Sequence, residues 1–205
     1  MLVMVSGAAL YGAVLGGWHG GRLLLYAAVK LPLVLLITCL LTLIFSVVGA
    51  RALGVPLALL DVAVLTVTAL AIASLLLAAL APVAAFFEWA CPRPSPHARL
   101  AHNLLYLMHT AFVGICGLVG CRALWHGLSS RFASATQPRG LRSVFALWIL
   151  AYALVGGEVA WAFRPFVGSV FEPVAFLRDD ALRGNVYEFI VTDIVPYLRS
   201  GETPP

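Results

Sequence analysis

Four long apolar runs constrain this chain more than any other feature of its sequence. They cover residues 24–48, 56–81, 100–121 and 143–163, and each is about as long as the roughly 20 residues that a helix needs to cross a bilayer. Their side chains do not alternate between apolar and polar positions, as a membrane β-barrel would require. The runs therefore predict an all-α fold, a polytopic transmembrane helical bundle.

The composition excludes a soluble domain. Hydrophobic residues make up 62% of the chain and charged residues 11%, whereas ordinary globular proteins have roughly 45–50% and about 25%. A soluble fold would lack the polar side chains that cover a surface in water. The net charge of +4 comes from scattered basic residues rather than from a basic face or tail, so we expect the lipid bilayer as a partner and no nucleic acid.

The first segment, residues 2–17, is apolar but short and rich in glycine. Its length leaves two alternatives open, a fifth crossing or a segment that dips into the bilayer. It lacks the basic start and the small-residue cleavage site of a signal peptide, so we expect it to be retained. Gly12 and Gly16 have the GxxxG spacing that lets membrane helices approach closely, and we expect them to pack against another helix.

Prolines, glycines and arginines suggest where the other spans end and how they pack. The second run stays apolar beyond its expected end, so it either tilts strongly or, as we expect, breaks near Pro82 and finishes as an interfacial piece. The loop at 122–142 holds arginines and no acidic residue, which places it in the cytoplasm by the positive-inside rule. The third run carries a stripe of glycines suited to helix contact: Gly114, Gly117 and Gly120.

Ionisable side chains inside a bilayer are costly and therefore mark candidate functional positions. The candidates are Lys30, Asp61, Glu88, Glu158 and Arg164. For Lys30 two alternatives stand: its ammonium reaches the headgroups, or it pairs with an acid inside the bundle. Asp61 lies in the first turns of its helix, where a carboxylate complements the helix dipole as a cap. Glu88, beside Trp89, is expected in the headgroup zone.

Glu158 has the largest choice of partners among these candidates. We expect it to face the bundle interior and to pair with Lys30, Arg164 or His109. His109 and His102 lie about 10.5 Å apart along one helix, so they cannot be the two axial ligands of one haem iron. We therefore expect no haem.

Patterns typical of enzymes and metal sites are missing from the sequence. There is no Walker A, GxGxxG, HExxH or GxSxG motif. Cys39, Cys91, Cys116 and Cys121 have neither CxxC nor zinc-like spacing, and we interpret them as packing residues. We therefore expect no metal, no cofactor and no enzymatic activity.

A series of short motifs surrounds the end of the last span. They are Trp161, an RPFxGS-type segment at 164–169, a proline–aromatic–arginine stretch at 173–178 and a G-N-x-Y element at 184–187. Together with Tyr11-Gly12 and Lys30-Leu31-Pro32, they resemble an uncharacterised family of bacterial polytopic inner-membrane proteins, loosely in the manner of small five-span Yip1-like proteins. The resemblance implies a helical bundle and a membrane address, but no established activity.

Two regions follow from these patterns. Residues 1–168 form the transmembrane domain, with four spans and a fifth segment at 2–17 that crosses or dips. Residues 169–205 form an interfacial tail, in which 189–198 is expected to be an amphipathic helix lying on the membrane.

Three classes of function remain open. Short loops, glycine-lined helix faces and few buried charges favour a non-enzymatic scaffold or an accessory subunit of a membrane complex, with self-association or other membrane subunits as partners. The alternative is a small oligomeric channel or transporter with Lys30, Glu158 and Arg164 near the path. An intramembrane thiol or redox enzyme is the third class, and no motif supports it.

Overall fold

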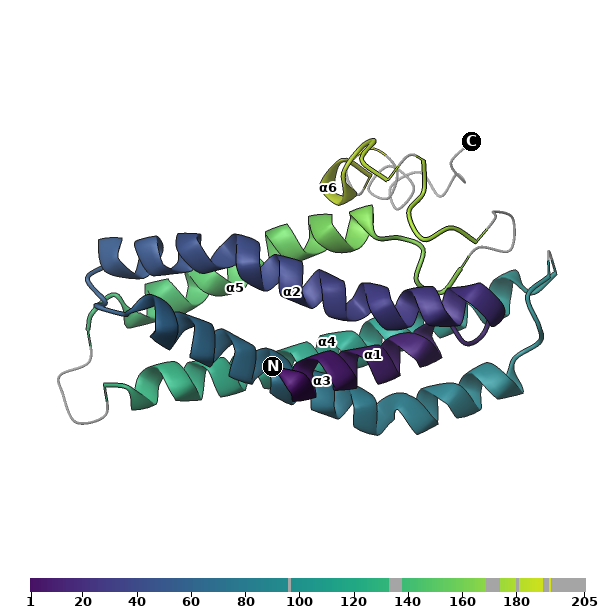
Figure 1. The fold of residues 1–205 in the computed structure, drawn as a ribbon, viewed down its shortest axis with the longest axis horizontal. Coiled ribbons are helices and arrows are strands. Elements are labelled where there is room, and N and C mark those ends of the chain that lie inside the picture. The colour runs from purple at the N-terminus through teal and green to yellow at the C-terminus, as the bar shows by residue number, and fades with distance from the viewer. Residues whose placement is uncertain (96, 133–137, 169–173, 180, 190–191, 193–205) are drawn as a thin grey trace.

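The computed structural model describes the whole chain except residues 96, 133–137, 169–173, 180, 190–191 and 193–205. Figure 1 shows its helices, which are numbered in chain order. Their bounds are α1 Leu2–Leu15, α2 Gly21–Ala52, α3 Leu59–Ala90, α4 Arg99–Ser130, α5 Leu141–Ala162 and α6 Val186–Phe189. Every regular element of the described chain is a helix, which confirms the all-α class.

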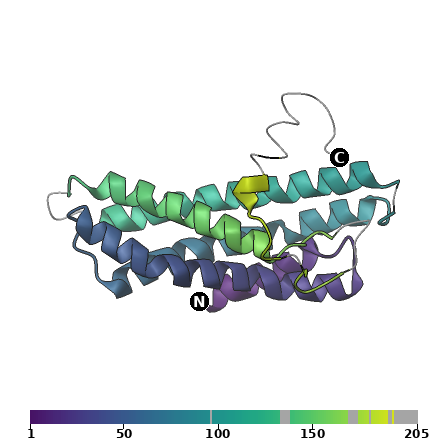
Figure 2. The same cartoon turned by 90° about the horizontal axis from the view of Figure 1, so that it is seen from above.

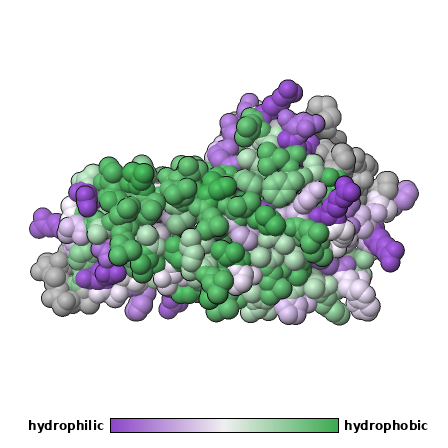
Figure 3. Space-filling view, viewed as in Figure 1, coloured by the Kyte–Doolittle hydropathy of each residue, from purple (hydrophilic) through white to green (hydrophobic). Residues whose placement is uncertain are grey.

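Helices α2 to α5 are long and apolar enough to cross a membrane. The first three of them have 32 residues each, which corresponds to about 48 Å at 1.5 Å per residue. A hydrocarbon core is about 30 Å thick, so these helices tilt or extend into the headgroups. Apolar side chains cover the middle of the face in Figure 3, and polar ones gather toward both ends. The chain is therefore a multi-pass integral membrane protein.

The helices form an open arc rather than a closed ring. Helix α1 packs between α2 and α3, α4 packs on the other side of α3, and α5 packs against α2. Helices α4 and α5, at the two ends of this arc, make only sparse contact, for example where the rings of Trp125 and Phe145 lie 5.2 Å apart. We call the open side between these two helices the α4–α5 seam.

Helix α1 accompanies the bundle along only part of its length. It begins near the middle of the bundle and ends at the same end as the start of α2 (Figures 1 and 2). Its 14 residues correspond to about 21 Å, which is shorter than the hydrocarbon core. The helix therefore spans only part of the bundle, and a segment that dips into the bilayer stays a prediction.

Glycines bring α1 close to its neighbours. A methyl group at Gly12 would collide with the carbonyl oxygen of Ala27, and one at Gly16 would lie 2.6 Å from that of Leu23. Gly7, which the sequence analysis did not single out, faces Ser74 of α3 in the same way, at 2.7 Å. These contacts allow α1 to lie against the α2 and α3 backbones, as small residues do in membrane helix pairs.

The expected glycine stripe of α4 is only partly a packing surface. Gly120 packs against α3, because a methyl group there would lie 3.1 Å from the carbonyl oxygen of Ala69. Gly114 and Gly117 have no atom of the described chain within 4 Å of the position that a methyl group would take. These two residues thus make no helix contact within the described chain and point toward the open side of α4, and their role in helix packing stays a prediction.

The expected break near Pro82 is wrong, because α3 continues through it to Ala90. Proline removes one backbone N–H and hence one hydrogen bond of the helix. Pro82 lies on the exposed face of α3. In a bilayer, unwinding the helix would leave further backbone groups without partners, so the continuous helix costs less.

The arginine-rich loop is shorter than expected. Helix α4 runs on to Ser130 and α5 begins at Leu141, so Arg122 and Arg142 are helical rather than part of the loop. A helix keeps its backbone hydrogen bonds after it leaves the hydrocarbon, which allows such an extension. Most of the amphipathic helix expected at 189–198 lies outside the described residues.

Candidate functional site

Three buried side chains from three helices form a hydrogen-bonded chain. Tyr11 of α1 lies with its hydroxyl oxygen 2.9 Å from Nδ1 of His109 on α4. Nε2 of the same imidazole lies 3.1 Å from Oε1 of Glu88 on α3. The side chains of His109 and Glu88 are only 3% and 8% exposed. We call Tyr11, His109 and Glu88 the polar triad.

The neutral imidazole satisfies both contacts of the triad at once. When Nε2 carries the proton, it donates to Glu88, and Nδ1 accepts the hydroxyl proton of Tyr11. Buried polar groups need such partners, since an unpaired one costs about 1–3 kcal/mol. Tyr11 therefore orients the ring that holds one oxygen of the Glu88 carboxylate.

Close packing of α1 positions this triad. Because Gly12 and Gly16 let α1 lie against α2, the neighbouring Tyr11 is fully buried and reaches α4. Glu88 follows the buried face of α3, which contains Ser74, Leu77, Ala81 and Ala84. This spacing of three or four residues is the signal that could have placed Glu88 on the buried face of α3.

Aromatic residues close the end of the bundle near the triad. The Trp18 indole N–H donates to the carbonyl oxygen of Pro92 at 2.9 Å, which connects the turn after α1 to the loop after α3. The Trp18 ring lies 5.5 Å from that of His102, which is about two helical turns from His109 along α4. These contacts hold the ends of α1, α3 and α4 together.

Two cavities lie on different sides of the triad. One, of about 310 Å³, is lined by Glu88 and by Gly17, Trp18, Ala85, Trp89, Cys91 and Arg93. The other, of about 220 Å³, is mainly apolar and is lined by His109, Tyr106 and residues of α1, α2, α5 and the segment after α5. Glu88 therefore lines a cavity with charged groups, whereas His109 lines an apolar one.

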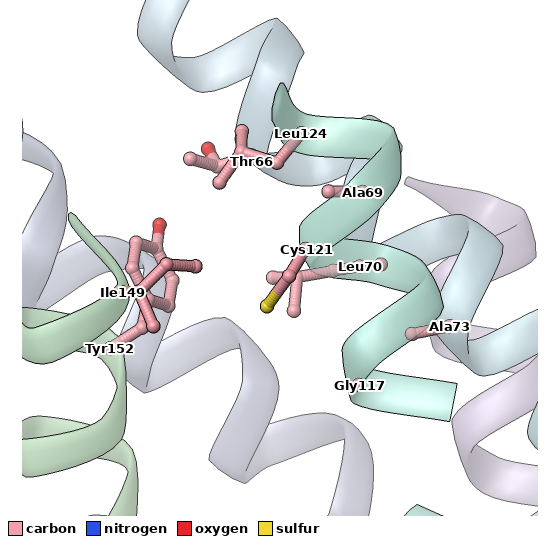
Figure 4. Close-up of a pocket in the computed structure, with 10 residues that line it drawn as sticks. Thr66, Ala69, Leu70, Ala73, Gly117, Cys121, Leu124, Ile149 and Tyr152 are labelled. Atoms are coloured by element: carbon pink, nitrogen blue, oxygen red, sulfur yellow. The ribbon is translucent and has the colours of Figure 1, made fainter. Parts of the chain in front are cut away.

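A third cavity opens on the α4–α5 seam (Figure 4). It has a volume of about 160 Å³, and in the figure Cys121 and Tyr152 approach it from opposite walls. Its walls are mainly apolar and come from α3, α4 and α5. They are formed by Thr66, Ala69, Leu70, Ala73, Gly117, Gly120, Cys121, Leu124, Ile149 and Tyr152.

Lys30 is fully buried and is held by backbone oxygens. Its Nζ donates to the carbonyl oxygens of Pro165 at 3.0 Å and Ala175 at 3.3 Å. The same ammonium lies 5.9 Å from the ring centre of Phe166 and 5.5 Å from that of Phe176. Within the described residues Lys30 forms no ion pair with an acid, and its role is to fasten the chain after α5 onto α2.

Glu158 and Arg164 are not members of the polar triad. Glu158 lines an open hollow of about 510 Å³ between α5 and α6, together with Asn185 and Tyr187. The Tyr187 hydroxyl donates to the carbonyl oxygen of Leu154 at 2.8 Å, and burial together with Glu158 raises the pKa of Tyr187. Arg164 donates to the carbonyl oxygen of Trp161. His109 thus pairs with Glu88 rather than with Glu158.

Asp61 lies at the opposite end of the bundle and caps α3, as its position suggested. The backbone N–H of Ala58 donates to its Oδ2 at 3.2 Å. Its Oδ1 also pairs with Nη1 of Arg131 at 2.7 Å, which connects the start of α3 to the end of α4. Both partners are partly exposed, so this pair contributes at most about 1 kcal/mol.

No cluster of three potential metal ligands occurs in the described part of the chain, and the four cysteines are free thiols. No family model, curated protein or solved structure matches this chain. Its chemistry must therefore be argued from the triad, the cavities and the seam.

Proposed function

We propose that this protein is a non-enzymatic subunit of a membrane complex, which binds a transmembrane helix of another subunit along the α4–α5 seam. The observation that carries the proposal is the open arc, in which α4 packs closely against α3 only. Gly114 and Gly117 face open space there. Small residues on an exposed helix face let a second backbone approach closely, which is how membrane helices associate.

Membership of a complex is tested by purification in a mild detergent. The protein is expected to co-purify with another membrane protein in a fixed ratio. Gly117→Phe, which places a ring in the seam, is expected to abolish this association. Leu118→Phe places the same ring on the exposed side of α4, where Leu118 is 71% exposed, and is expected to leave the association intact. Purification of the wild-type chain alone would overturn the proposal.

The alternative is a small oligomeric channel or transporter with Lys30, Glu158 and Arg164 near its path. It has less support, because Lys30 is bound to backbone oxygens and Glu158 lines a separate hollow at α6. Ion flux through reconstituted liposomes that changes with Glu158→Gln would favour this alternative.

The proposed address is the bacterial inner membrane, with the end of the bundle that carries Arg122, Arg131, Arg139 and Arg142 in the cytoplasm. The connection between α4 and α5, which holds arginines and no acidic residue, supports that orientation. The absence of catalytic motifs from the sequence supports a non-enzymatic role.

A further inference from the structure

The 310 Å³ cavity beside the triad differs from the other two in carrying groups of opposite charge. Glu88 contributes a carboxylate from the last turn of α3, and Arg93 contributes a guanidinium from the loop that follows. Trp18 and Trp89 form part of the wall. The cavity lies where α3 ends, and two tryptophans in its wall are typical of a position at the membrane–water interface.

Glu88 is held so that one of its two oxygens remains available. Oε1 contacts His109, whereas Oε2 lies over Gly17, which also lines the cavity. A methyl group at Gly17 would lie 2.5 Å from Oε2, so the absence of a side chain at this position leaves the space for that oxygen. The triad therefore fixes a buried carboxylate with one oxygen toward the cavity.

Arg93 is exposed and forms no ion pair with any residue that the structure describes. A guanidinium in the headgroup zone is suited to a phosphate, because its fork of N–H groups matches two phosphate oxygens. The loop that carries it is fastened by the bond from Trp18 to Pro92. The carboxylate and the guanidinium thus belong to one cavity with fixed walls.

We propose that this cavity binds the phosphoethanolamine headgroup of a membrane phospholipid. The ammonium donates to Glu88 Oε2 and the phosphate accepts from Arg93, while the acyl chains lie along the exposed apolar faces of the bundle. A primary ammonium has three N–H donors, whereas a quaternary choline has none, and a headgroup with only negative charge would be repelled by Glu88. Charge complementarity therefore selects a zwitterion with a primary amine.

Lipid binding is measured on the purified protein in detergent by native mass spectrometry and thermal unfolding. Phospholipids with identical acyl chains and ethanolamine, choline or glycerol headgroups are compared. The ethanolamine lipid is expected to bind about tenfold more tightly than the other two, as one hydrogen bond to a charged group provides. Equal binding of all three lipids would overturn the proposal.

Single variants test the ammonium contact and the phosphate contact separately. Glu88→Gln is expected to remove the preference for ethanolamine over choline. Arg93→Gln is expected to weaken the binding of all three lipids. Arg139→Gln, at the other end of the bundle, is expected to change neither. A preference that persists in Glu88→Gln would overturn the assignment of the ammonium site.

Two further measurements keep the result interpretable. Tyr11→Phe perturbs the triad but leaves both charged groups, so it is expected to retain the ethanolamine preference even where its thermal stability falls. Its loss in this variant would mean that the preference reflects triad integrity and not the charged groups of the cavity. Soluble glycerophosphoethanolamine is expected to bind far more weakly than the lipid. Equal binding of the soluble compound would overturn the assignment to a membrane lipid.

Discussion

At the scale of single residues, two buried polar side chains of this protein, His109 and Lys30, find their partners far away in the chain. His109 joins Tyr11 and Glu88, and Lys30 holds the carbonyl oxygens of Pro165 and Ala175. A polar group in a bilayer has no water to replace a lost partner. We therefore expect a substitution at one of these positions to destabilise the protein mainly because the remaining partner is buried without a hydrogen bond.

Removal of His109 tests this expectation for the triad. His109→Leu leaves the Glu88 carboxylate buried without its ring N–H, which is expected to lower the free energy of unfolding by about 3–5 kcal/mol. Glu88→Gln with His109→Leu is expected to cost less than the two single changes together, with a coupling of about 0.5–3 kcal/mol. Reversible unfolding in detergent micelles measures the three variants. Strictly additive losses would show that the two side chains do not interact.

Replacement of Lys30 by methionine tests the contact between α2 and the chain after α5. Two hydrogen bonds to a charged group are lost, each contributing about 1.5–3 kcal/mol, so this segment is expected to open more often. Tryptic cleavage after Arg178, followed by mass spectrometry, is expected to accelerate roughly tenfold or more. Arg22→Met, an exposed cation at the start of α2, is the matched control and is expected to leave the rate unchanged.

At the scale of helices, α1 is the element whose position depends most on small side chains. Its glycines bring it against backbone atoms of α2 and α3, and its burial places Tyr11 at His109. Helix α4 has glycines of similar spacing that face open space. The same residue type therefore serves packing in one helix and leaves an accessible face in the other.

A pair of matched alanine substitutions distinguishes these two uses of glycine. Gly12→Ala places a methyl group against the carbonyl oxygen of Ala27 and is expected to destabilise the bundle by about 1–3 kcal/mol. Gly114→Ala meets no atom and is expected to be neutral or to stabilise α4 by up to about 1 kcal/mol, because alanine favours helix. Thermal unfolding in detergent compares the two, and equal destabilisation would contradict the difference in packing.

At the scale of the whole molecule, the four long helices alternate in direction, so successive connections lie at opposite ends of the bundle. Helix α2 starts at the same end of the bundle as α3 ends and α4 begins, and the α2–α3 and α4–α5 connections lie at the opposite end (Figure 1). Because α1 does not span the bundle, it leaves this order unchanged. The cavity with Glu88 and Arg93 and the arginine-rich loop therefore lie on opposite sides of the membrane.

Cysteine labelling in intact cells or sealed vesicles tests this arrangement. In a chain whose four native cysteines are replaced by alanine, cysteines at positions 54 and 139 are expected to react with an impermeant maleimide from one side. Cysteines at positions 22 and 93 are expected to react only from the other side. Reaction of positions 54 and 93 from the same side would contradict a crossing by α3.

Much of the fold could be predicted from the sequence because membrane insertion depends on the composition of each segment. A run of about 20 apolar residues crosses a bilayer whatever its neighbours are, so the four spans and the all-α class follow from hydropathy. The cap formed by Asp61 is equally local, since its partner Ala58 lies within the same turn. The ends of α3 and α4 were harder to predict from the sequence, because a helix can continue through a proline and beyond the hydrocarbon core.

The sequence by itself determined that this chain is a multi-pass helical membrane protein with a few costly polar side chains. Only the tertiary structure decided which of them meet, that α1 spans only part of the bundle and that the arc stays open between α4 and α5. The reason is physical: in a bilayer, apolar faces toward lipid and toward protein have the same composition, so hydropathy does not rank one helix face above another. Partners such as Glu88 and His109 are selected by packing geometry, which the linear pattern does not contain.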